Sequence, residues 1–143
     1  MKSLIIITLF ICTLISCTKD YTEELEFDIQ QYPQKWQLIE MSGNIQISVT
    51  MGAKMTWQEF YLLDANGTFI KYREQDGIVV QVSGNFSFEE KPDGKYLTLE
   101  YKTDNPIIGS CTRQKEILAF ESNRLISTWW ACDGPGLFYK RTE

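Results

Sequence analysis

Short runs in which apolar and polar residues alternate are the main pattern along most of the chain. In the clearest run, Val80, Val82, Phe86 and Phe88 are separated by polar residues and by Gly84. An alternation with a period of two is typical of a β-strand that has one face in a core and the other in water. Helical periodicity is weak throughout, so the pattern predicts an all-β fold.

Turn-forming residues divide these runs. Asp64-Ala65-Asn66-Gly67 predicts a hairpin turn, because Asn and Gly tolerate the positive φ angles that tight turns need. Gly84, in the middle of an alternating run, predicts a bulge or a sharp bend, as at the corner of a barrel. We expect strands at 35–41, 57–63, 68–73, 80–88, 97–101, 115–120, 125–131 and 137–141, with further turns at 74–77, 91–94, 122–123 and 133–136, and a long loop at 42–56 that can hold a short strand at 45–49.

About eight consecutive strands joined mainly by short turns favour an up-and-down meander. Such a sheet removes its exposed edges most readily by closing on itself. The expected fold is therefore an all-β, eight-stranded, antiparallel up-and-down barrel that occupies residues 33–143.

The chain begins with one early positive charge, Lys2, and an apolar run from Leu4 to Ile15. This is the layout of an export signal, and the run is shorter than the roughly 20 residues of a membrane-spanning helix. The run ends in Leu14-Ile15-Ser16-Cys17, which resembles the lipobox of bacterial lipoproteins. An ordinary cleaved signal with a chance cysteine is the alternative.

The lipobox resemblance implies that residues 1–16 are removed and that Cys17 carries acyl lipid such as palmitate. Two or three acyl chains give stable membrane anchoring, where one chain is marginal. Residues 17–32 are then a lipidated, acidic, flexible tether. The expected location is the cell envelope, with the outer membrane favoured and the leaflet left open.

Two of the four cysteines remain after Cys12 is lost with the signal and Cys17 is lipidated. They are Cys111 and Cys132, an even pair in an oxidising compartment, which predicts a disulfide. If Ser122-Asn123 is the apex of a hairpin, residue 132 lies opposite about residue 113, close to Cys111. Two free thiols are the alternative.

Composition excludes several functions. The chain has no histidine, which removes the commonest general base and metal ligand, and no catalytic or metal motif stands out. We therefore expect no enzyme, no metal and no cofactor. Beyond the signal, 19 acidic residues face 13 basic ones once Lys2 is removed, a net charge of −6. An acidic domain repels phosphate backbones, so a nucleic acid is an unsuitable partner, whereas a neutral apolar ligand or a basic protein is compatible.

Four segments together resemble the lipocalin-like domains of small lipoproteins from Bacteroidetes-type bacteria. They are Lys35-Trp36-Gln37-Leu38, Asp64-Ala65-Asn66-Gly67-Thr68-Phe69, Ser83-Gly84-Asn85-Phe86-Ser87-Phe88 and Leu137-Phe138-Tyr139-Lys140-Arg141. The family usually has Gly where this chain has Gln34. The resemblance implies a barrel that binds a small apolar ligand.

The sequence gives two hypotheses for function and a candidate cavity. The first is a binding module for a small apolar ligand. The alternative is a protein-interaction module, such as an envelope inhibitor of a lysozyme or protease, which would have a filled barrel and act through a loop at 42–56 or 104–111. Trp36 either plugs the closed end of the barrel or floors a cavity, and Trp129 and Trp130 are expected on opposite faces of a strand. The candidate cavity residues are Trp36, Leu38, Phe60, Leu62, Ile70, Tyr72, Val82, Phe86, Phe88, Leu99 and Trp129.

Overall fold

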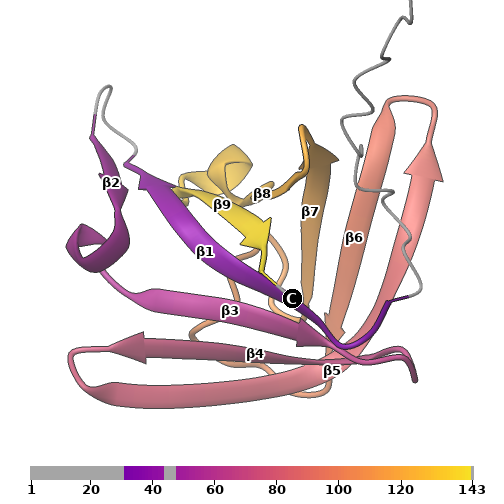
Figure 1. Cartoon of the computed structure of the whole chain (residues 1–143), viewed down its shortest axis with the longest axis horizontal. Coiled ribbons are helices and arrows are strands. Elements are labelled where there is room, and N and C mark those ends of the chain that lie inside the picture. Colours follow the sequence, from indigo (N-terminus) through magenta and orange to yellow (C-terminus); the bar gives the residue numbers. More distant parts are fainter. Residues whose placement is uncertain (1–30, 44–47, 143) are drawn as a thin grey trace, which may run out of the picture.

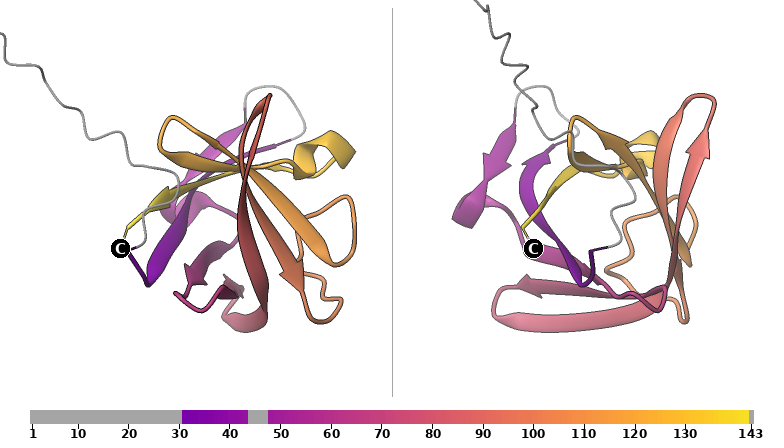
Figure 2. Two further views of the ribbon diagram at one scale, coloured as in Figure 1. Left: turned by 90° about the vertical axis from the view of Figure 1, so that its right-hand side faces the viewer. Right: turned by 45° about the vertical axis from the view of Figure 1, so that its right-hand side comes forward.

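The computed structural model describes residues 31–43 and 48–142. These residues form one antiparallel sheet that curls until its first and last long strands, β1 and β9, pair with each other (Figure 1). The turned views in Figure 2 show the strands wrapping around a common interior. The expected closed eight-stranded up-and-down barrel is confirmed. Cys17, the segment 1–16 and nearly all of the expected tether lie outside the described residues.

The strands follow one another around the barrel in chain order, and each pairs with its neighbours. They are β1 (Gln34–Ser42), β3 (Gln58–Leu63), β4 (Thr68–Gln75), β5 (Ile78–Lys91), β6 (Gly94–Tyr101), β7 (Lys115–Glu121), β8 (Arg124–Ser127) and β9 (Gly136–Arg141), with a short β2 (Val49–Met51) paired to the end of β1 and two 3-10 helices, η1 (Gly52–Lys54) and η2 (Trp129–Cys132).

Two elements differ from the sequence-based expectation. The short strand lies at Val49–Met51, whereas we expected one at 45–49. The expected strand at 125–131 ends at Ser127, and Trp129 and Trp130 lie in η2. The backbone leaves the extended region at Thr128, whose φ of −87° and ψ of 4° start the helical turn. Trp129 is still half-buried and Trp130 is 63% exposed, because the 3-10 turn also places successive side chains on different sides.

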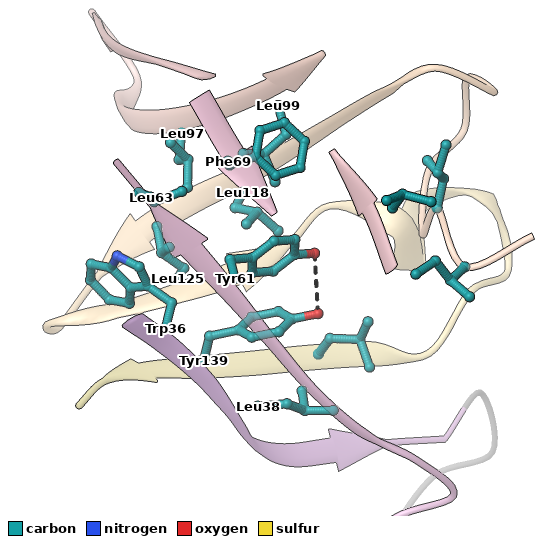
Figure 3. Close-up of a cluster of buried hydrophobic side chains, with 14 of the residues drawn as sticks. Trp36, Leu38, Tyr61, Leu63, Phe69, Leu97, Leu99, Leu118, Leu125 and Tyr139 are labelled. Carbon is teal, nitrogen blue, oxygen red and sulfur yellow. Dashed lines mark hydrogen bonds between the residues drawn. The ribbon is translucent and has the colours of Figure 1, made fainter. Parts of the chain in front are cut away.

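Buried side chains mark the inner face of the barrel. Side chains alternate between buried and partly exposed along β3 and β4. In β1, a bulge between Leu38 and Glu40 shifts the register against β9 and keeps Met41 buried three positions after Leu38. The barrel therefore has one continuous apolar core (Figure 3), to which Trp36, Leu38, Leu63, Phe69, Leu97, Leu99, Leu118, Leu125 and Leu137 contribute.

We name the two ends of the barrel by their tryptophans. At the Trp36 end, where β1 begins, the Trp36 side chain is 2% exposed and packs edge-on against Phe120 at a centroid distance of 6.1 Å. Trp36 is therefore part of the packed core at this end. At the Trp129 end, where β1 finishes, lie η1, η2, the turn between β4 and β5, and the loop 102–114.

β5 turns the corner of the barrel at Gly84. Its first half pairs with β4 as far as Asn85, and its second half, from Gly84 onward, pairs with β6. In Figure 1 the strand runs beside β4 and then turns upward beside β6. A Cβ at Gly84 would lie 1.9 Å from the Glu100 carbonyl oxygen and 2.8 Å from the Phe69 ring. The expected sharp bend is confirmed, and glycine is required because the neighbouring backbone leaves no room for a side chain.

Gly84→Ala should lower the free energy of unfolding by about 1–3 kcal/mol, because the new methyl group forces the β5–β6 pairing and Phe69 to move. The matched control is Ser83→Ala, one position away on the exposed face, which should change stability by no more than about 0.5 kcal/mol. Equilibrium denaturation in urea measures both. Equal stability of the two variants would contradict this role for Gly84.

Candidate functional site

A charged cluster occupies the interior of the barrel. The Lys71 ammonium lies 2.7 Å from a Glu116 carboxylate oxygen and 3.2 Å from a Glu59 carboxylate oxygen. All three side chains are at most 1% exposed. Adjacent inward positions of β3 and β4 supply Glu59 and Lys71, and β7 supplies Glu116 from across the barrel. Lys71 therefore links two sides of the interior.

Arg73 extends this cluster toward the Trp129 end. Its Nε donates to Glu59 at 2.5 Å, and its Nη2 donates to the carbonyl of Ile107 at 3.0 Å. Its guanidinium carbon lies 4.2 Å from the centre of the Trp57 ring. With Arg73 the cluster contains two carboxylates and two cations, so the buried charges balance.

Three tyrosine hydroxyls complete the hydrogen bonding of the carboxylates. Tyr61 and Tyr101 donate to Glu116 at 2.7 and 2.6 Å, and Tyr139 donates to Glu59 at 2.5 Å. Figure 3 shows the hydroxyls of Tyr61 and Tyr139 facing each other, 3.4 Å apart. The carboxylates are therefore surrounded by donors, which is the condition under which buried charges are tolerated.

Burial holds the three phenols in their neutral form. The pKa of Tyr61 is raised well above 10.0, first by burial and then by the nearby Glu116 carboxylate. The pKa of Tyr101 is raised by the same two causes, and that of Tyr139 by burial and by Glu59. Ionising any of these phenols would place a third negative charge among the two carboxylates.

The loop 102–114 covers the charged cluster at the Trp129 end. Ile107 and Ile108 are buried, and the backbone N–H of Gly109 donates to the Glu116 carboxylate. The Trp129 ring packs against Gly109 and Gly134, where a Cβ would lie 2.8 and 2.3 Å from ring atoms. The loop thus seals the interior by apolar packing and by its own backbone hydrogen bonds.

The expected Cys111–Cys132 disulfide is confirmed. It ties the loop 102–114 to η2 across a Cα–Cα distance of 5.7 Å and a sequence separation of 21 residues. The turn at Ser122-Asn123, at the apex of the β7–β8 hairpin, brings the two cysteines together, as the sequence suggested. A cross-link over a loop of this length contributes about 3 kcal/mol in the chain-entropy model.

The candidate cavity residues do not come together in one space. Trp36, Leu38, Val82 and Leu99 are buried in the packed core, where they fill the interior. Phe86, Phe88 and Trp129 are partly buried against that core.

The other four candidates, on the β3–β4 hairpin, face outward. Phe60 pairs with Tyr72, and Leu62 pairs with Ile70, on the outer side of the sheet. The Phe60 and Tyr72 rings stack at 4.8 Å, and Ile70 is 38% exposed. The hairpin register pairs Leu63 with Phe69, and these two side chains face inward together with Tyr61. The expectation that the other four side chains of the hairpin line the interior therefore needs correction: Phe60, Leu62, Ile70 and Tyr72.

Two large depressions lie at the Trp129 end, outside the sealed interior, and a smaller one of about 190 Å³ lies beside Arg73 and Ile107. The larger has a volume of about 500 Å³, and its walls include Met41, Thr50, Trp57, Trp129 and Pro135. The second, of about 450 Å³, lies between η1 and the turn from β4 to β5 and includes Gln58, Glu74 and Asp76. Thr56 and Trp57 border both depressions. The space available to a ligand is therefore at the mouth of the barrel.

Sequence reasoning missed the charged cluster. Glu59, Lys71, Arg73 and Glu116 each occupy a strand position whose phase decides whether the side chain points inward. The register pairs Glu59 with Arg73, opposite charges that are equally common on exposed sheet faces. The usable signal was the spacing of two that Glu59, Lys71 and Arg73 keep from Tyr61, Leu63 and Phe69, and that Glu116 keeps from Leu118.

No protein-family model, curated protein or solved structure matches the chain. Within residues 31–43 and 48–142, no cluster of three or more His, Cys, Asp or Glu side chains is arranged to hold a metal ion. The same residues include no helix long and apolar enough to cross a membrane. The structure therefore defines a class, a closed eight-stranded β-barrel with a charged interior and a covered end, which is compatible with ligand binding.

Replacing Lys71 by Met should lower the free energy of unfolding by about 3–5 kcal/mol, because it leaves two buried carboxylates facing each other without their shared cation. Lys102→Met, at an exposed position next to β6, is the matched control and should cost no more than about 0.5 kcal/mol. Chemical denaturation measures both variants. A cost below about 1 kcal/mol for Lys71→Met would show that the cluster is not essential to the fold.

The raised tyrosine pKa values predict the pH dependence of stability. Below pH ~10 the phenols are neutral in both folded and unfolded chains, so they do not make stability depend on pH. Above pH ~10 the unfolded chain releases protons that the folded barrel retains, so stability falls as pH rises. An ultraviolet titration should show three of the seven tyrosines ionising only when the protein unfolds. Reversible ionisation of all seven in the folded state would contradict this.

Proposed function

We propose that the chain is a membrane-anchored envelope lipoprotein whose barrel binds a small apolar ligand at its mouth, in the depression of about 500 Å³ at the Trp129 end. The sequence supports the anchoring through Leu14-Ile15-Ser16-Cys17. The barrel fold is compatible with ligand binding. The sealed, charged interior argues for a site at the mouth.

The observation that carries this proposal is the larger depression. Its volume falls within the roughly 300–1,000 Å³ of small-molecule sites. The indole rings of Trp57 and Trp129, the Met41 side chain and Pro135 give it a mainly apolar lining. Ser42, Thr50 and Thr56 add a few hydroxyl groups. This composition is expected of a site for a largely apolar small molecule that carries few polar groups.

The position of this depression suits an anchored protein. β1 starts at Gln34, directly after the expected tether, and ends at Ser42, which borders the depression. Nine residues of strand span roughly 26 Å. The expected tether would therefore join the barrel at the end opposite the proposed binding site.

The test uses a soluble form that begins at Thr18 and is expressed with export. Native mass spectrometry after incubation with an envelope lipid extract should show an added mass that disappears on denaturation. Thr56→Trp, which places a large ring between the two depressions, should abolish that mass. Thr103→Trp, on an exposed part of the covering loop, should retain it. A bare polypeptide from the unmodified barrel would overturn the proposal.

A second candidate is a protein-interaction module, such as an inhibitor of an envelope-active enzyme. It is favoured by exposed apolar side chains on three elements at the Trp129 end. These are Val49 and Met51 in β2, Ile78 and Val79 after the β4–β5 turn, and Trp130 in η2, each at least 50% exposed. A bare polypeptide in the lipid experiment, together with a stable complex with a basic envelope-active enzyme, would favour this candidate.

A further inference from the structure

Trp57 has a buried hydrogen-bond donor without a partner. Its indole nitrogen is shielded from solvent, and within the described part of the chain it is the buried side-chain polar atom that makes no hydrogen bond. Trp57 lies between η1 and β3, in the wall that the two depressions share. A buried donor without an acceptor lowers stability, so an acceptor supplied by a ligand would be favoured.

The charged interior holds the Trp57 ring in place. The Arg73 guanidinium lies 4.2 Å from the centre of the ring, in a cation–π contact. Arg73 is itself fixed by Glu59 and by the Ile107 carbonyl. One side of the indole is therefore occupied by a cation that already has its partners, and Trp57 is presented to the mouth on a rigid support.

The charges around the larger depression restrict the polar group of a ligand. None of the described residues that line the depression is a Lys or an Arg. A ligand carboxylate or phosphate would therefore lose its hydration without gaining a cation as partner. The polar group that fits is a neutral acceptor oxygen, such as the carbonyl of an ester, an amide or a ketone.

We propose that Trp57 is a specificity-determining residue and that the ligand is a neutral amphiphile whose acceptor oxygen receives the hydrogen bond of the Trp57 indole. This inference rests on the proposed ligand site and adds the chemical class of the ligand. Because the nitrogen is shielded before binding, the groups that cover it move aside as the ligand enters. Trp57 then packs against the apolar part of the ligand, and its N–H favours ligands that carry a neutral acceptor oxygen.

The test compares three probes with similar chains: methyl octanoate, nonane and octanoate. Affinities are measured for the soluble barrel by native mass spectrometry and by tryptophan fluorescence. Methyl octanoate should bind more tightly than octanoate, whose carboxylate finds no cation among the described lining residues. Trp57→Phe removes the donor and should weaken methyl octanoate by about tenfold while changing nonane by less than about threefold. Trp130→Phe, an exposed tryptophan outside the depression, should leave both affinities unchanged.

A second variant separates the hydrogen bond from packing. Replacing Trp57 by the benzothiophene analogue of tryptophan keeps the ring area and the Arg73 contact but removes the N–H. It should reproduce the selective loss of methyl octanoate. An equal loss of methyl octanoate and nonane in both variants would overturn the role of the indole N–H and leave the proposed site standing. Failure of all three probes to bind the unmodified barrel would overturn the proposed function as well.

Discussion

Lys71 is held between the carboxylates of Glu59 and Glu116 in the interior of the barrel, and much of the molecule is arranged around that contact. Two buried carboxylates repel each other strongly in a medium of low polarity, and the ammonium placed between them offsets that repulsion. Tyr61 and Tyr101 donate to the second oxygen of Glu116, and Arg73 donates to the second oxygen of Glu59. Tyr139 and the Gly109 N–H add donors to the two oxygens that Lys71 contacts. The interior is full because this cluster, with its donors, occupies the space that a ligand would need.

The same cluster determines how the Trp129 end is built. Arg73 links Glu59 to the backbone of the covering loop and to the Trp57 ring. Glu116 holds the loop through Gly109, and the disulfide fixes the next part of that loop to η2. Both tryptophans that border the larger depression therefore rest on groups tied directly to the interior. A ligand site at the mouth gains a rigid wall from contacts that are themselves shielded from water.

Several features could be predicted because they depend on short stretches of sequence. The turn at Asp64–Gly67, the bend at Gly84 and the hairpin that brings Cys111 to Cys132 each follow from residue types with specific backbone preferences or from simple spacing. The candidate site was predicted less well. The β3–β4 hairpin is apolar on both faces, and alternation alone does not say which face points inward. Trp57, next to a strand start, carried no signal that its nitrogen would be buried without a partner.

The class of fold, the number of barrel strands and most turns follow from the amino-acid sequence, because alternation and turn chemistry are local properties of the chain. The charge balance and the absence of histidine are likewise properties of the sequence. That Glu59, Lys71, Arg73 and Glu116 face inward depends on the folded barrel, since its closure and the pairing between distant segments set the phase of each strand. That closure places charge in the interior, and the largest depression described here lies at the mouth, beside Trp57 and Trp129.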